Sequence, residues 1–335
     1  MKTEIRTLLA PYRGGRVVHS TWQLLSTLAL FLACWLAMWW SIQVSYALTL
    51  MLALPASGLA VRLFILQHDC GHGSFFPSLT ANRIIGNCLG VLTLTPFQCW
   101  RRQHAMHHAT NGQLDHRGIG DIRTLTVAEY RQASRWKRLC YRIYRHPLVL
   151  FGIGPFLHFV ILQRLTSRLP RRWRDEKRSV HLTNIAVAIV VLAVGWSVGP
   201  VTLTRIHLPI VFLSASWGVW LFYVQHQFDP TYWQRDEQWD HGAAAVQGSS
   251  HLVLPWPLSW FTANIGLHHI HHLDSRLANY SLATCYRAHP QLQSAQRLTL
   301  LASLACMRLK LWDEKSQRLV SFREARRLNS IRRGD

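Results

Sequence analysis

Histidines recur in three separate segments of the chain at spacings that suit metal binding. The segments are His68-Asp-Cys-Gly-His72, His104-Ala-Met-His107-His108 and His268-His-Ile-His271-His272. On a helix, residues three and four positions apart share a face, so the imidazoles of each segment can point toward one place. Imidazole suits iron, copper, zinc and nickel, and this many histidines exceed what one tetrahedral ion can use. The sequence therefore predicts a site for two metal ions.

Other polar residues are candidates to complete or support this site. His226 ends an apolar run at the membrane face where an earlier run delivers His68, so its position makes it a ninth candidate ligand. Metal-bound imidazoles usually donate their second N–H to a carboxylate or carbonyl. The supporting candidates are Asp69, Asp115, Asp121, Asp229, Asn264, His269 and Asp274. An exposed loop or a helix cap is the alternative role for each carboxylate, a cap for Asn264, and a structural role for His269.

Long apolar runs must position these histidines. Residues 22–42 and 45–66 form one pair of runs, and residues 182–199 and 208–225 form a second pair. About 20 apolar residues suffice for a helix to cross a hydrocarbon core. We therefore expect an all-α integral membrane protein with four transmembrane helices in two hairpins. In the second hairpin, the first helix is expected to end at Gly199-Pro200 and the next helix to begin near Pro209.

The basic residues predict the orientation of these helices. Lys and Arg number four in residues 1–20, ten in 101–147, seven in 163–178 and thirteen after 226. The two short hairpin loops hold only Arg205. The positive-inside rule then places both termini in the cytoplasm. A single membrane domain over residues 1–335, with a cytosolic C-terminal region from 226 to 335, is the expected organisation.

Two shorter apolar segments, 84–97 and 148–162, are interrupted by glycine and proline. If 84–97 crossed the bilayer, the second histidine segment would face the opposite side from the first. We therefore expect both segments to be interfacial or re-entrant. The tail from Leu292 to Arg333 alternates apolar and basic residues, as an interfacial helix would.

Composition excludes several other classes of protein. The net charge of +21 could indicate nucleic-acid binding, but the basic residues lie between and beyond the apolar runs and form no separate basic module. No nucleic-acid partner is expected. The seven cysteines are scattered and include no C-x-x-C pair, so neither a disulfide framework nor a thiolate zinc site is predicted.

The histidine segments and their flanks resemble the membrane fatty acid desaturases, in particular the bacterial acyl-lipid branch. The first segment matches the family's H-x-x-x-H pattern in His-Asp-Cys-Gly-His-Gly-Ser-Phe-Phe, and the other two match H-x-x-H-H. Gln-His-Gln-Phe around His226 and Gln-Gly-Ser-Ser from Gln247 extend the match. The resemblance implies a four-helix membrane bundle and a cytosolic cap with two non-haem irons, whose ligands would be the nine histidines above.

The resemblance also implies the reaction and its partners. A reduced diiron pair and O₂ would remove two hydrogens from a membrane lipid acyl chain and leave a cis double bond. The sequence His-Pro-Gly-Gly, expected of a fused haem-binding donor domain, is absent, so a separate, ferredoxin-like carrier is expected to deliver electrons. The expected location is the bacterial cytoplasmic membrane, with the metal site on the cytoplasmic side.

Two rival functions remain open. Related histidine-box membrane enzymes hydroxylate alkanes, sterols or carotenoids, since return of oxygen to the substrate competes with removal of the second hydrogen. A non-catalytic membrane metal-binding protein is the rival from another class. Transport would usually place ionisable ligands within the bilayer, whereas these clusters follow the ends of the apolar runs.

Overall fold

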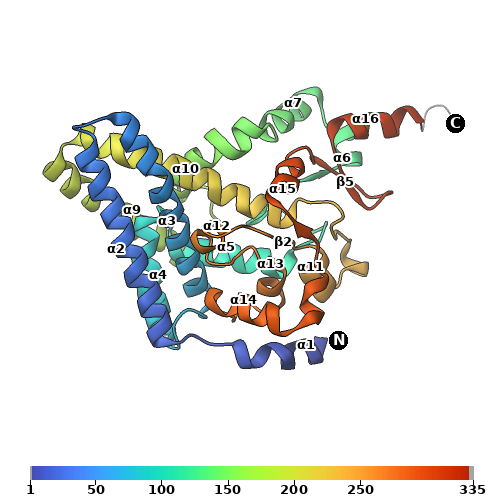
Figure 1. The fold of residues 1–335 in the computed structure, drawn as a ribbon. Helices are drawn as coiled ribbons and strands as arrows, with labels where there is room; N and C mark the ends of the chain where they lie inside the picture. The colour runs from blue at the N-terminus through green and yellow to red at the C-terminus, as the bar shows by residue number, and fades with distance from the viewer. Residues whose placement is uncertain (1, 332–335) are drawn as a thin grey trace.

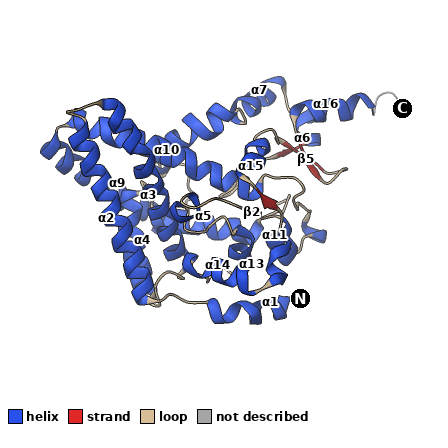
Figure 2. Cartoon of the chain, viewed as in Figure 1, coloured by secondary structure: helices blue, strands red, loops and turns tan. Residues whose placement is uncertain are grey.

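The computed structural model describes residues 2–331, which fold mainly as helices (Figure 1, Figure 2). Among them, four helices are long and apolar enough to cross a bilayer: α2 (Val17–Ser41), α3 (Tyr46–His72), α9 (Arg174–Val198) and α10 (Pro200–His226). α2 and α3 pack against each other, and α10 packs against α3, α9 and α2. α3 is the most buried of the four, so it lies at the centre of this group.

The four helices match the predicted apolar runs but have different bounds. α3 continues to His72, beyond the predicted end at residue 66, and stops where Gly73 adopts a left-handed φ of 70°. α9 begins at Arg174, because Asp175 and Glu176 suit the positive end of the helix although they are not apolar. A count of apolar residues sees only the part of a helix that suits hydrocarbon, so it misses such polar turns.

α10 corrects the prediction that the last long helix opens at Pro209. Its first residue is Pro200, and Pro209 lies inside the helix. Arg205, expected in the hairpin loop, is therefore a helical residue. Proline fits the first turn of a helix without losing a hydrogen bond, which makes Pro200 the better starting point.

The two shorter apolar segments form broken helices. α4 (Leu79–Leu92) covers most of 84–97, and its 14 residues rise only about 21 Å, less than a hydrocarbon core of about 30 Å. Residues 148–162 form the π-helical turn η2 (Val149–Ile153), α8 (Gly154–Val160) and the start of η3 (Leu162–Arg164). This stretch bends by 61° from α7 (Arg135–Tyr144), as a broken span or re-entrant loop does.

Most of the remaining elements form the part of the molecule that lies beyond the ends of α3 and α10 (Figure 1). Its further helices are α1 (Lys2–Leu9), α5 (Phe97–Thr110), α6 (Val127–Gln132), α11 (His241–Gln247), α12 (Leu258–Phe261), α13 (His268–Leu273), α14 (Asn279–Ala288), α15 (Leu300–Cys306) and α16 (Phe322–Ile331). Short 3-10 turns are η1 (Ala10–Tyr12), η4 (Asp236–Gln238) and η5 (Pro290–Ser294).

This part also contains short strands, which the all-helical expectation did not include. β1 (Leu125–Thr126) pairs in parallel with β4 (Leu311–Asp313), which pairs antiparallel with β5 (Arg318–Val320). β2 (His251–Leu252) pairs in parallel with β3 (Arg297–Leu298). The prediction of one interfacial helix from Leu292 to Arg333 is wrong over the described residues, because β3, β4 and β5 interrupt it (Figure 2). Every residue of β4 is buried, so this part of the tail folds into the core.

Candidate dimetal centre

Five histidines converge in the first of two metal-binding arrangements. They come from the end of α3, from α5 and from α13, and their ring nitrogens lie within 4.8 Å of one another. The members of this first set are His68, His72, His104, His108 and His271. Nε2 of His108 lies 3.1 Å from Nε2 of His104 and 3.0 Å from Nε2 of His271.

Four other histidines form the second set, also within 4.8 Å of one another. These are His107, His226, His268 and His272, and all four are buried. Nε2 of His226 lies 3.1 Å from Nε2 of His107 and 2.9 Å from Nε2 of His268. The imidazoles of His108 and His272, one from each set, stack with their centroids 4.1 Å apart, so the two sets are immediate neighbours.

The spacing of the nitrogens fits a shared metal ion in each set. With a metal–nitrogen bond of about 2.1 Å, two ligands at right angles lie about 3.0 Å apart, whereas tetrahedral ligands lie about 3.4 Å apart. The closest pairs lie 2.9–3.1 Å apart, which is near enough for both nitrogens of a pair to bind one ion. Nε2 of His72 is buried without a hydrogen-bond partner in the described structure, as expected for a nitrogen whose role is to bind a metal ion.

Electrostatics also suits metal binding. Burial, followed by the charges that neighbouring imidazoles would carry, holds the pKa of His104, His108 and His271 well below the usual 6.5. The same causes lower the pKa of His268 and His272. These imidazoles are therefore neutral at pH 7, which is the protonation state that binds a metal ion.

Two of the proposed supporting carboxylates contact histidines of these sets. Nδ1 of His107 donates to Asp121, and Nδ1 of His68 lies 3.1 Å from Oδ1 of Asp69. Asp69 also accepts hydrogen bonds from the backbone N–H and the side-chain amide of Asn279, at 2.7 and 2.9 Å. Its carboxylate thereby connects α3 to α14.

A backbone carbonyl supports the second set. Nδ1 of His226 donates to the carbonyl of Gly248 at 3.0 Å, which leaves Nε2 free to point at the other histidines. Gly248 belongs to the Gln-Gly-Ser-Ser stretch whose pattern matched the family. The sequence pattern pointed to this stretch, but only the structure shows that its Gly248 carbonyl binds His226.

The other supporting candidates make different contacts. Asp115 accepts from Arg235, Asp229 from Arg318, and Asp274 from both Arg13 and Arg276. Nε2 of His269 donates to the carbonyl of Leu292 at 2.8 Å, outside the two metal sets. Asn264 has a left-handed φ of 58° and its carbonyl accepts from the N–H of Leu267, so its backbone shapes the turn before α13.

Aromatic residues that sequence reasoning missed pack on the histidines. Trp100 stacks on His104, with ring centroids 4.7 Å apart and 16° between planes. A Cβ at Gly71 would lie 2.8 Å from the Trp100 ring, so glycine is needed between Cys70 and His72 for this close approach. Gly71 lies inside the first histidine box and Trp100 lies shortly before the second, which was the one available signal.

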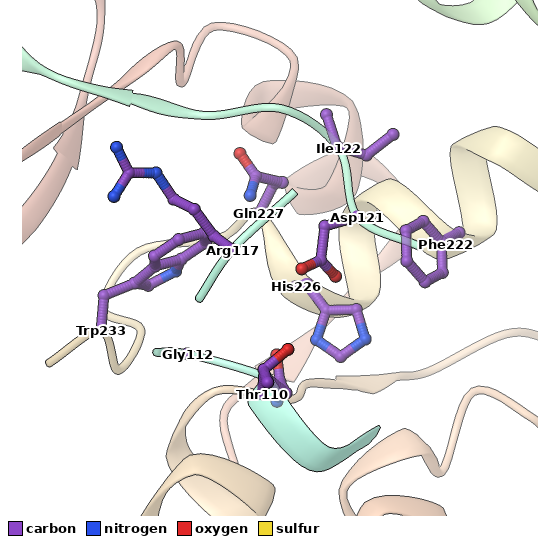
Figure 3. A pocket seen from close by; sticks show the side chains of 10 residues that line it. Thr110, Gly112, Arg117, Asp121, Ile122, Phe222, His226, Gln227 and Trp233 are labelled. Atoms are coloured by element: carbon purple, nitrogen blue, oxygen red, sulfur yellow. The ribbon is translucent and has the colours of Figure 1, made fainter. Parts of the chain in front are cut away.

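A pocket adjoins the second set (Figure 3). Asp121 and Ile122 come from the segment before β1, while Phe222, His226 and Gln227 come from the end of α10 (Figure 3). Phe222 contacts the rings of His107 and His226, with centroid distances of 5.1 and 5.4 Å. His226, a member of the second set, therefore lines this pocket.

Comparison with known proteins identifies the family. A family model described as fatty acid desaturase matches residues 43–302, a range that contains both histidine sets. The chain belongs to the fatty acid desaturase family. Members of this family are oxidoreductases that use iron. The histidine sets described above thus lie in the part of the chain that the desaturase family defines.

Individual desaturases show the same relationship. A fatty acid desaturase of Bacillus subtilis (strain 168) is 43% identical over 315 residues, which cover 94% of this chain and 89% of that protein. A probable fatty acid desaturase of Sorghum bicolor is 29% identical over 67% of this chain and 59% of its own length. An sn-1 acyl-lipid omega-3 desaturase (ferredoxin) of Synechocystis is 28% identical over 66% of this chain and 61% of its own length.

Proposed function

We propose that this desaturase is an O₂-dependent acyl-lipid enzyme that introduces a cis double bond through a diiron centre. The first set, with five histidines, would hold one iron, and the second set, with four, would hold the other. The observation that carries the proposal is the convergence of nine imidazoles into two adjacent sets, in a chain of the desaturase family.

The chemistry explains why such a centre is needed. An unactivated methylene C–H bond lies beyond any acid or base that a side chain offers, so the iron pair, when bound, supplies the oxidising chemistry with O₂. The protein keeps the imidazoles neutral and oriented. Asp121 and the Gly248 carbonyl each hold a proton on Nδ1 of one histidine, so that its Nε2 remains free. Phe222 and Trp100 pack on imidazole rings of the two sets and would limit the access of water to the ring faces that they cover.

The substrate and the electron donor are inferred from relatives. Because one relative is an acyl-lipid desaturase named with ferredoxin, we infer a membrane lipid acyl chain as substrate and a separate ferredoxin-like carrier as donor. The many basic residues on the predicted cytoplasmic side would attract an acidic carrier. The same residues would also attract anionic lipids.

The four long helices support insertion into the bacterial cytoplasmic membrane as a single domain of two hairpins. Both termini and the metal centre would then face the cytoplasm. Reporter fusions test this orientation: a reporter active only in the cytoplasm should work at the C-terminus and fail in the turn at residues 42–45. The opposite result would refute the orientation.

The function is tested by fatty acid analysis of a host that expresses the intact chain, beside His107→Ala and His158→Ala variants. Gas chromatography with mass spectrometry, after derivatisation at double bonds, should reveal a new alkene with the intact chain. His107→Ala should abolish the alkene and lower the iron content, because it removes a member of the second set. His158→Ala, a change on α8 outside both sets, should be mild.

The other products distinguish the alternatives. A hydroxylated acyl chain would show a hydroxylase instead. An alkene that persists at full yield in His107→Ala would refute the metal assignment. If the purified intact protein binds iron but forms no product with a reduced ferredoxin and lipid, the proposed pairing of a ferredoxin donor with an acyl-lipid substrate is refuted.

A further inference from the structure

α7 exposes an apolar face although it lies outside the four long helices. Trp136, Leu139 and Ile143 are 70%, 47% and 51% exposed. Their spacing of three and four residues places them on one side of the helix. Large apolar side chains gathered in this way mark a surface that contacts a membrane or another protein.

The opposite side of α7 is fixed to the rest of the molecule. Tyr141 is buried, and its hydroxyl accepts from the N–H of Leu125 at 3.1 Å and donates to the carbonyl of Lys310 at 2.6 Å. The hydroxyl of Tyr144 accepts from the N–H of Arg123 at 3.1 Å. These bonds set the rotation of the helix, so its apolar face points outward because of the fold.

The charge of α7 identifies an anionic partner. The helix carries Arg135, Lys137, Arg138 and Arg142, and the sequence has no acidic residue between Glu129 and Asp175. A helix with one apolar face and basic flanks suits a membrane surface that carries anionic headgroups.

The apolar face of α7 continues into a membrane-adjacent segment. Leu148, Ile153 and Leu157, in the next two helical turns of the chain, are 72%, 57% and 39% exposed. η2 and α8 pack against α10, one of the four long helices. Figure 1 shows α7 leading away from α10 along one edge of the molecule. This continuity favours the bilayer over a soluble protein as the occupant of the face.

We propose that α7 lies in the plane of the membrane surface and binds anionic lipid. Trp136, Leu139 and Ile143 enter the acyl region, while Arg135 and Arg138 meet the phosphates. The proposal rests on the membrane insertion proposed above and not on desaturation. Its test therefore reads the position of α7 and leaves activity aside.

The experiment places a fluorescent label on each side of the helix. In a Cys88→Ser/Cys140→Ser background, which removes the two exposed cysteines, Leu139→Cys and Lys137→Cys are each labelled with bimane. The two positions lie on different faces of α7, since two residues turn a helix by about 200°. The full chain is placed in nanodiscs of phosphatidylcholine, with or without phosphatidylglycerol, that contain nitroxide-labelled lipid. The unlabelled background variant corrects for label on the remaining cysteines.

The label at residue 139 should be quenched several-fold more than the label at residue 137. Quenching at 139 should increase with phosphatidylglycerol, and Arg135→Gln/Arg138→Gln should reduce that increase. Equal, weak quenching at both positions would overturn the proposal and indicate a protein partner for this face. Strong quenching at residue 139 that does not change with phosphatidylglycerol would overturn the proposal that α7 binds anionic lipid. The substituted residues are exposed, except Arg138, which is half-buried, so folding should persist, and size-exclusion chromatography checks it.

Discussion

Neighbouring histidines in this desaturase point into different metal sets. His107 belongs to the second set and His108 to the first, and His271 and His272 divide in the same way. Successive residues on a helix differ by about 100° in direction, so adjacent imidazoles cannot meet at one point. The sequence prediction that each H-x-x-H-H box points toward one place was therefore too simple. Each of these two boxes contributes to both sets.

The hydrogen bond from His107 to Asp121 leads to the first prediction at the level of residues. Asp121→Asn removes the negative charge that accepts the Nδ1 proton and supports the Nε2 lone pair. Loss of such a supporting carboxylate typically costs about 10–100-fold in metal affinity. We expect iron binding at the second set to weaken by about tenfold or more, measured by competition with a chelator of known affinity.

A matched control is available in Asp115→Asn. Asp115 contacts Arg235 near the surface, with 2.5 Å between Oδ1 and Nη1, and lies in neither set. Its substitution should leave iron affinity unchanged. Equal affinity in the Asp121→Asn and Asp115→Asn proteins would contradict the role assigned to Asp121.

Sequence could nominate these carboxylates but could not rank them. Asp69, Asp115, Asp121, Asp229 and Asp274 all lie close in sequence to a candidate histidine or a box. Asp69 and Asp121 contact imidazoles, whereas each of the other three contacts an arginine from a distant part of the chain, and Asp274 also contacts the nearby Arg276. The partner of each carboxylate depends on which distant segments the fold brings next to it, and the local sequence does not contain that information.

At the level of elements, Arg145 connects α7 to the end of α10. It is fully buried, and its guanidinium donates to Oε1 of Gln227 at 3.1 Å and to the carbonyl of Leu309 at 2.9 Å. It also donates to the carbonyl of Arg123 at 3.2 Å. Gln227 directly follows His226, so this network fixes the point where α10 delivers its histidine. Replacing Arg145 should therefore loosen several elements together.

Arg145→Met tests this connection. The substitution keeps a long apolar stem but leaves buried oxygens without a donor, at a cost of about 1–3 kcal/mol each. We expect the apparent Tm in detergent to fall by several degrees, measured by size-exclusion chromatography after heating. Lys137→Met, an exposed change on the same helix, should have little effect. An unchanged or higher Tm in Arg145→Met would mean that the cost of burying the guanidinium exceeds the gain from its hydrogen bonds.

The elements also show what sequence could and could not predict. Apolar runs located all four long helices, because about 20 mostly apolar residues in a row are typical of a helix that crosses a bilayer. The start of α9 at Arg174 was missed, since its first turn is charged. β4 and β5 were missed because strands of three residues carry too little pattern, and the tail that holds them also fits a helical period.

At the level of the whole molecule, the two metal sets place many imidazoles in a buried interior. The pKa of His104, His108, His268, His271 and His272 is lowered there, chiefly by burial. Unfolding exposes these rings to water, where their pKa returns to about 6.5. The unfolded chain therefore binds more protons than the folded, metal-free protein once the pH falls below about 6.5.

The final prediction follows from this difference. A group whose pKa is lower in the folded state gives stability that is present above its unfolded pKa and is lost as the pH falls. For the metal-free protein, each such histidine should lower the free energy of unfolding by about 1.4 kcal/mol per pH unit below 6.5. The apparent Tm in detergent should be nearly constant from pH 8 to 7 and should fall steeply from pH 6.5 to 5.

Bound iron competes with protons for the same nitrogens, so the iron-loaded protein should lose stability only at a lower pH. His116→Gln, a change at an exposed imidazole beside Asp236, should leave the profile unchanged. A metal-free protein with a flat profile from pH 7 to 5 would contradict the neutral, buried state of the histidine sets, because protonation would then cost the folded state no more than the unfolded one.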